Sequence, residues 1–164
     1  MKAFFFKILL VTFIFIVFSA CQNKGKDYHL YSIEKEILQD PHKAYNYLDS
    51  IGKEIKDAPD STQMFYQILL CRAKDKCYIR HKSDSTMQNV VKYYKSRNDK
   101  EHLMQAYYCM GCINRDLQQA DKALKYFHNA LDCSKNSNKY ELIARIYSQM
   151  GQLQQDGYAD EFAL

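Results

Sequence analysis

The hydrophobic positions between residues 103 and 134 follow the period of an α-helix twice, with a short polar break between the two runs. Because residues 115–119 leave room only for a tight turn, we predict two helices that pack side by side as an antiparallel pair. The first run has the i, i+3, i+4, i+7, i+8 spacing of one helix face, at Leu103, Ala106, Tyr107, Met110 and Gly111. The second run repeats this period at Ala120, Ala123, Leu124, Phe127, Ala130 and Leu131.

One glycine, Gly111, stands inside the first apolar stripe. Glycine within a helix costs about 1 kcal/mol relative to alanine, so a glycine on the packing face needs a physical reason. We interpret Gly111 as a place where a neighbouring helix passes too close for a side chain. The alternation of small and large residues along the second run also favours two closely interlocked helices.

The central helix pair resembles the tetratricopeptide repeat, a helical hairpin of about 34 residues. The positions that match the motif are Tyr107, Met110 and Gly111 in the first helix and Ala123, Phe127 and Ala130 in the second. Two positions depart from it, because Asn114 replaces the usual tyrosine and Lys135 stands where a proline often ends the unit. The open alternative is an ordinary helical hairpin within a bundle.

The same pattern recurs on both sides of the central pair, at nearly equal intervals along the chain. It appears before the pair at Tyr66, Leu69 and Leu70, and after it at Tyr147, Met150 and Gly151. Further helices are predicted over residues 28–39, 41–56 and 61–78, and after Ser83. Residues 159–164 are predicted to begin a second helix, which leaves the last repeat incomplete. We therefore expect an all-α domain over residues 28–164, made of tetratricopeptide-like antiparallel hairpins stacked as a short right-handed solenoid.

The segment from Met1 to Cys21 has the features of a targeting sequence. A basic start is followed by an uncharged apolar core over residues 8–18, which is shorter than the roughly 20 residues of a membrane-spanning helix. The sequence Phe18-Ser19-Ala20-Cys21 resembles a bacterial lipoprotein box. The resemblance implies a signal peptide over residues 1–20, acylation of Cys21 by chains such as palmitate, and a polar tether over residues 21–27. The alternative is a plain secretory signal.

Charge and composition narrow the range of functions. Removing Lys2 and Lys7 of the leader leaves 21 basic against 19 acidic residues, a balance of +2 that is too even for a nucleic-acid-binding face. The five histidines are scattered, and neither a phosphate-binding loop nor a nucleophile elbow is present in the sequence. We therefore expect no catalysis, no cofactor and no metal.

A C-x-x-C pattern is formed by Cys109 and Cys112, which raises the alternative of a thiol redox protein. A reactive thiol of this kind normally lies at a helix N-terminus, where its pKa is lowered. Both residues lie in the middle of a predicted helix, so we favour a packing role for them.

The tetratricopeptide resemblance implies a concave groove, lined by the first helix of each unit, that holds a partner segment. The positions implied are Gln105, Tyr108, Cys112 and Arg115, then Arg145, Ser148 and Gln152, with Lys74 and Gln67 as less certain equivalents. Such a groove would be polar with a positive bias, which suits an extended or acidic peptide. The alternative is that these residues are ordinary solvated surface.

The segments LLCRAKDKCYIRHKSDSTMQ and KEHLMQAYYCMGCINRD together resemble lipoprotein tetratricopeptide proteins of Bacteroides-type bacteria. We therefore expect a lipid-anchored envelope protein, facing the periplasm, whose repeats bind a protein or peptide partner. The alternative is the truncated sensor portion of a tetratricopeptide and helix-turn-helix signalling regulator.

Overall fold

A computed structural model describes residues 30–135 and 137–162 of the chain, with side chains described up to residue 155. Most of these residues are helical and none of them lies in a strand, which confirms the predicted all-α class. The leader, Cys21 and the tether lie outside the described residues. A helix over residues 30–39 is followed by α2 (Pro41–Ile51), the 3-10 helix η1 (Glu54–Asp57), α3 (Asp60–Lys76), α4 (Ser85–Ser96), α5 (Lys100–Asp116), α6 (Ala120–Cys133) and α7 (Tyr140–Phe162).

Aspartate side chains cap the starts of two helices. The side chain of Asp40 accepts a hydrogen bond of 3.0 Å from the Lys43 N–H, and Pro41 follows at the first position of α2. Asp99 accepts a bond of 3.1 Å from the His102 N–H at the start of α5. Each cap satisfies a backbone donor that has no partner within its own helix.

Three helices end in the same left-handed turn. The residues just beyond α3, α4 and α5 are Tyr78, Asn98 and Gln118, whose φ angles are 57°, 53° and 59°. After α3, the Ile79 N–H donates to the Lys74 carbonyl at 2.9 Å, which is the six-to-one bond of a Schellman motif. The backbone therefore has the same left-handed conformation after each of these three successive helices.

Two predicted boundaries are wrong. The helix expected over residues 41–56 is divided, because α2 ends at Ile51 and η1 follows as a separate turn. The second helix expected over residues 159–164 is also not formed, because α7 continues unbroken to Phe162. No proline interrupts this segment, and the glycines within it cost only about 1 kcal/mol each, so the helical hydrogen bonds continue.

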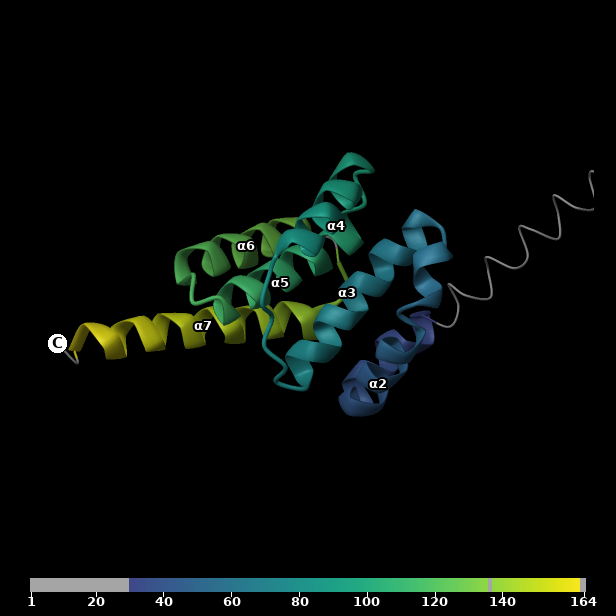
Figure 1. The fold of residues 1–164 in the computed structure, drawn as a ribbon. Coiled ribbons are helices and arrows are strands. Elements are labelled where there is room, and N and C mark those ends of the chain that lie inside the picture. The colour runs from purple at the N-terminus through teal and green to yellow at the C-terminus, as the bar shows by residue number, and fades with distance from the viewer. Residues whose placement is uncertain (1–29, 136, 163–164) are drawn as a thin grey trace, which may run out of the picture.

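Helix α5 is the centre of the fold. It packs most extensively against α6 and also contacts α3, α4 and α7. Figure 1 shows α6 and α7 lying along opposite sides of it. Almost every residue of α5 from Leu103 to Asn114 is buried, Tyr107 being only partly covered. The predicted close approach at Gly111 is confirmed, because the Phe127 ring of α6 covers this glycine.

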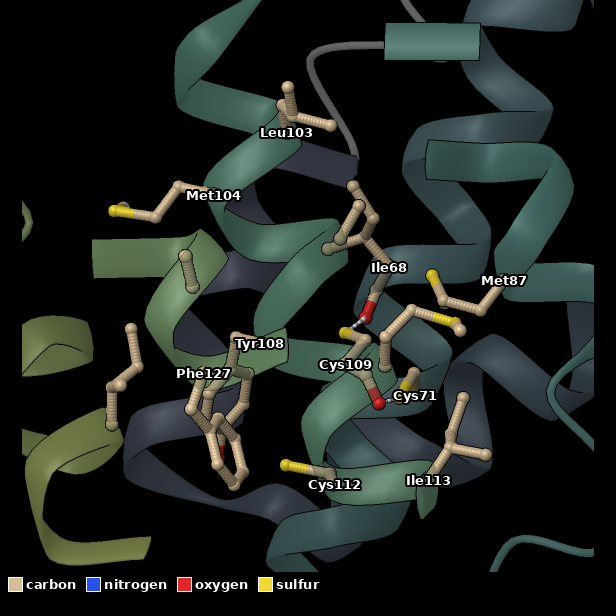
Figure 2. Close-up of a cluster of buried hydrophobic side chains, with 14 of the residues drawn as sticks. Ile68, Cys71, Met87, Leu103, Met104, Tyr108, Cys109, Cys112, Ile113 and Phe127 are labelled. Carbon is tan, nitrogen blue, oxygen red and sulfur yellow. Dashed lines mark hydrogen bonds between the residues drawn. The ribbon is translucent and has the colours of Figure 1, made fainter. Parts of the chain in front are cut away.

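The buried side chains form two adjacent clusters that share α3. One cluster joins helix 30–39, α2 and η1 to Phe65 and Leu69 of α3. The other joins the opposite face of α3, at Ile68 and Cys71, to α4, α5, α6 and α7. Figure 2 shows this second cluster, with Cys71 and Cys109 between α3 and α5. Helix α3 therefore has one face in each cluster and joins the two parts of the core.

Candidate binding groove

A groove of about 1060 Å³ opens on the side of the molecule where the ends of several helices meet. Its walls come from helix 30–39, the end of α3, both ends of the segment that joins α6 to α7, and the start of α7. Residues of α5 form part of the floor. The groove therefore brings together segments that are distant in sequence.

The floor of the groove contains a connected set of ion pairs. Arg72 of α3 donates to the Glu34 carboxylate at 2.8 Å and to the Gln105 side-chain oxygen at 2.7 Å. The Lys139 ammonium, just before α7, lies 2.9 Å from the same Glu34 oxygen and 3.2 Å from a Glu101 oxygen. These contacts link helix 30–39, α3, α5 and the start of α7.

The two central charges of this network have shifted pKa values. Burial by itself raises the pKa of Glu34, but the hydrogen bonds and charges of Lys139 and Arg72 outweigh it and leave this pKa below its ordinary value. Burial likewise favours a lower pKa for Lys139, and the two carboxylates beside it raise this pKa instead. Both groups are therefore held in their charged forms by their partners.

A second polar cluster lies deeper, below Tyr108. The Tyr108 hydroxyl donates to Asp75 at 2.7 Å, and the Arg115 guanidinium donates to the other oxygen of Asp75 at 3.0 Å. Arg115 also donates to Asp116 at 2.7 Å and to the side-chain oxygen of Gln149 in α7. Burial, followed by the charges nearby, raises the pKa of Tyr108 far above its usual range. The cluster fixes α3, α5 and α7 to one another.

Several cations of the groove wall have no such partner among the described residues. Lys35, Lys76, Lys100 and Lys135 line the groove, and no carboxylate oxygen in the described part of the chain lies within 4 Å of their ammonium groups. Burial lowers the pKa of Lys76, and the charge of Arg145 across the wall lowers it further. Asp132 is the one carboxylate of the lining without an ion pair among the described residues, so these four lysines leave an excess of positive charge in this part of the groove.

Apolar side chains are exposed at the rim of the same groove. Tyr31 is 50% exposed, Leu38 is 43% exposed and Tyr140 is 73% exposed. These are three of the five large hydrophobic side chains that are exposed among the residues whose side chains are described. Their concentration beside the lysines marks one surface as different from the rest.

The residues that the sequence suggests for the groove fall into three groups in the structure. Gln105 and Tyr108 are buried, and the Tyr108 side chain closes the floor beneath the opening. Arg145 lines the wall and lies 3.4 Å from Glu141. The remaining positions lie outside the groove lining, and they are Lys74, Gln67, Cys112, Arg115, Ser148 and Gln152.

Two segments of the lining are missing from the positions chosen by sequence. Helix 30–39 and the residues 132, 133, 135 and 137–139 supply much of the wall, including Glu34 and Lys139. The helix has no matched motif position, and the other residues are the end of α6 and part of the connection to α7. Three consecutive charged residues, 34–36, in a helix whose other positions are uncharged are the signal that could have indicated its part.

The cysteine pair of the C-x-x-C pattern is enclosed. Cys109 and Cys112 are both fully buried, and the Cys109 thiol donates to the Ile68 carbonyl at 3.7 Å. Burial, followed by the charge of Asp75, raises the pKa of Cys112. Burial also raises the pKa of Cys71. The surroundings of Cys112 and Cys71 therefore oppose formation of the reactive thiolate.

The described residues contain neither a cluster of metal-ligating side chains nor a membrane-spanning helix. No group of three histidine, cysteine, aspartate or glutamate side chains within residues 30–135 and 137–155 is placed to hold a metal ion. No helix in the described part of the chain combines the length and the apolar character needed to cross a membrane.

In comparisons of the chain with known proteins, no family model, no curated protein and no solved structure matches it.

Proposed function

We propose that this protein is a binding scaffold whose groove holds an extended, acidic segment of a partner protein. The observation that carries the proposal is the placement of uncompensated lysines beside exposed apolar side chains in one groove. Acidic side chains of a ligand would compensate the lysines, and hydrophobic side chains between them would cover the tyrosines and Leu38. The occupant is thus a peptide in which acidic and hydrophobic residues alternate.

The floor of the groove supports binding because it is already ordered. The ion pairs of Glu34 and the hydrogen bond between Tyr108 and Asp75 hold the walls in place without a ligand. A preformed site loses less conformational freedom when it binds, so more of the contact energy contributes to affinity. The acids of the floor are engaged with bases of this chain, and we assign them a structural role.

We propose that the helix pairs stack as in a tetratricopeptide array, in a short right-handed solenoid. The recurrence of Tyr-x-x-Met-Gly in α5 and α7 supports this, as does the close contact of Gly111 with Phe127. In such arrays most contacts are made between neighbouring pairs. The groove described above lies at the ends of the proposed array, where helix 30–39 approaches the start of α7.

We also propose attachment to the cell envelope through acylation of Cys21, on the periplasmic face. The sequence Phe18-Ser19-Ala20-Cys21 supports this, because cysteine stands at the one position where the acylation chemistry needs it. Two or more acyl chains give the stable anchoring that one chain does not. The alternative, in which the chain is the sensor part of a longer signalling regulator, uses the same groove to detect its ligand.

The experiment compares two fluorescent peptides that differ only in charge. One alternates glutamate with leucine and tyrosine, and the other has lysine at each glutamate position. We expect the acidic peptide to bind the full chain more tightly in an anisotropy titration. Replacing Lys76→Glu and Lys100→Glu together should weaken its binding by roughly tenfold or more, because two favourable charge contacts become repulsive.

The matched control carries the same change of net charge elsewhere. Lys92→Glu and Lys125→Glu lie on exposed positions of α4 and α6, away from the groove. This double variant should bind the acidic peptide like the unmodified chain. Equal affinity for both peptides, or equal loss in both double variants, would contradict the proposal.

A further inference from the structure

The contact between α5 and α6 depends on one glycine and two aromatic rings. A Cβ on Gly111 would lie 2.3 Å from Cε1 of Phe127, so the ring occupies the space of the missing side chain. One turn earlier in α5, the Tyr107 ring stacks on Tyr126 with centroids 6.2 Å apart. An aromatic side chain from the neighbouring helix is therefore what this glycine accommodates.

Helix α7 carries the same residues, but no helix of the described chain covers them. Tyr147 and Gly151 repeat in α7 the spacing of Tyr107 and Gly111 in α5. Tyr147 is 61% exposed, and no atom lies within 4 Å of the place where a Cβ on Gly151 would be. In Figure 1 the later part of α7 extends beyond α5 and α6. The face is separate from the groove, which Arg145 lines from another side of the helix.

The exposed face of α7 also carries the other half of the α5–α6 contact. In α6, Phe127 has alanines four positions before it and three positions after it. In α7, Tyr147 has Ala144 three positions before it and Gly151 four positions after it, and all three are exposed. The stripe thus has an aromatic ring between two small residues, and one of these, Gly151, has open space above it. The ring of one such stripe can therefore occupy the space above the glycine of a second, identical stripe.

The charge pattern agrees with a covered face. From Ile146 to Gln155 the helix contains no charged residue, although half of these positions or more are exposed. The exposed faces of α4 and α6 carry lysines such as Lys92 and Lys125. Depletion of charge is typical of the centre of a protein–protein interface.

We propose that two copies of this chain pair through α7, with the helices antiparallel and Tyr147 of each copy over Gly151 of the other. A two-fold axis between these positions makes both contacts equivalent, as an isologous interface requires. The α7 helix, of 23 residues, is about 35 Å long, which leaves room for further contacts on either side. This pairing does not depend on the groove or its ligand.

The test is the mass of the full chain in detergent solution, measured by light scattering with the detergent contribution removed. We expect twice the chain mass for the unmodified protein. Tyr147→Ala removes the ring, and Gly151→Leu fills the space that the partner's ring needs. Both variants should have the mass of a single chain while keeping the circular dichroism and thermal unfolding of a folded helical protein.

Tyr140→Ala is the matched control, because this tyrosine is also exposed on α7 but lies at the groove. It should retain twice the chain mass. A single-chain mass for the unmodified protein would overturn the proposal and favour a helix of a different protein as the occupant of this face. A double mass that persists in both Tyr147→Ala and Gly151→Leu would also overturn it.

Discussion

The Glu34 carboxylate and the Lys139 ammonium lie 2.9 Å apart, although 105 residues separate them in the sequence. Glu34 belongs to the first described helix, and Lys139 immediately precedes the last. The pair therefore links the first described helix to the start of the last across the floor of the groove. Because Arg72 holds the same carboxylate from α3, the position of Glu34 is determined by two cations on different elements.

Removing the charge of Glu34 should make stability less dependent on pH. The pKa of Glu34 in the folded chain lies below its ordinary value of 4.5, so its contribution is complete above that pH and is lost as the pH falls through the folded pKa. At neutral pH, Glu34→Gln removes the carboxylate that Arg72 and Lys139 share, leaves Lys139 only Glu101, and should cost about 1–3 kcal/mol. Urea unfolding at pH 7 and pH 3 should show a smaller difference in free energy at pH 3.

Glu36→Gln is the control for this change, because Glu36 lies in the same helix and pairs with the exposed Lys43 at 2.7 Å. Screening by water leaves such a pair with little effect on stability. A cost for Glu34→Gln that is equal at pH 7 and pH 3, or equal to that of Glu36→Gln, would show that the network does not stabilise the fold as described.

Two glycines at equivalent positions should respond oppositely to alanine. Gly111→Ala places a methyl group 2.3 Å from the buried Phe127 ring, and such overpacking typically costs about 1–3 kcal/mol. Gly151→Ala meets no atom within 4 Å and should stabilise α7 by up to about 1 kcal/mol. Both are best measured by urea unfolding in a Tyr147→Ala background, where the proposed pairing is removed. Changes of the same sign would refute the account of these positions.

The left-handed turn after α5 provides a site for a stabilising substitution. Gln118 has a φ of 59°, a conformation that costs a residue with a Cβ about 1–2 kcal/mol and costs glycine little. Gln118→Gly should therefore raise the free energy of unfolding by about 0.5–1 kcal/mol after its greater entropy in the unfolded chain is counted. Lys125→Gly, in the middle of α6, should lower it by about 1 kcal/mol. Thermal melts of both variants decide whether the turn is as described.

The thiols should label in an order set by their exposure. Cys77 and Cys133 are partly exposed, whereas Cys71, Cys109 and Cys112 are buried. We expect a thiol reagent to modify Cys77 and Cys133 of the native protein first, and the other three only as the chain unfolds. Peptide mapping after timed labelling measures this order. Rapid native labelling of Cys109 or Cys112 would instead support the redox alternative.

The helix pairs could be predicted from sequence because their signals are local. The spacing of apolar positions in α5 and α6 and the glycine at 111 each act over one or two helical turns. The burial of Gln105 and Tyr108 could not be predicted in this way. Their partners, Arg72 and Asp75, lie 33 residues earlier, and only the packing of α3 on α5 brings them together.

The position of the groove could likewise not be predicted from the repeat pattern. That pattern assigns groove positions to the first helix of each pair, yet α5 is covered by neighbours on most of its surface. The opening instead lies where helix 30–39 approaches the start of α7. Contacts between segments so far apart are set by the angles between successive helix pairs, which depend on the sum of many side-chain contacts.

The most direct test of the proposed function is to find where a bound acidic peptide attaches to the full chain. A peptide that alternates glutamate with leucine, and carries one benzophenone side chain, can be photocrosslinked and the attachment sites mapped by mass spectrometry. We predict attachment at the groove, on or next to Tyr31, Leu38 and Tyr140, and its loss when Lys76→Glu and Lys100→Glu are combined. Attachment spread over α4 and α6, or unchanged in that double variant, would contradict the proposal.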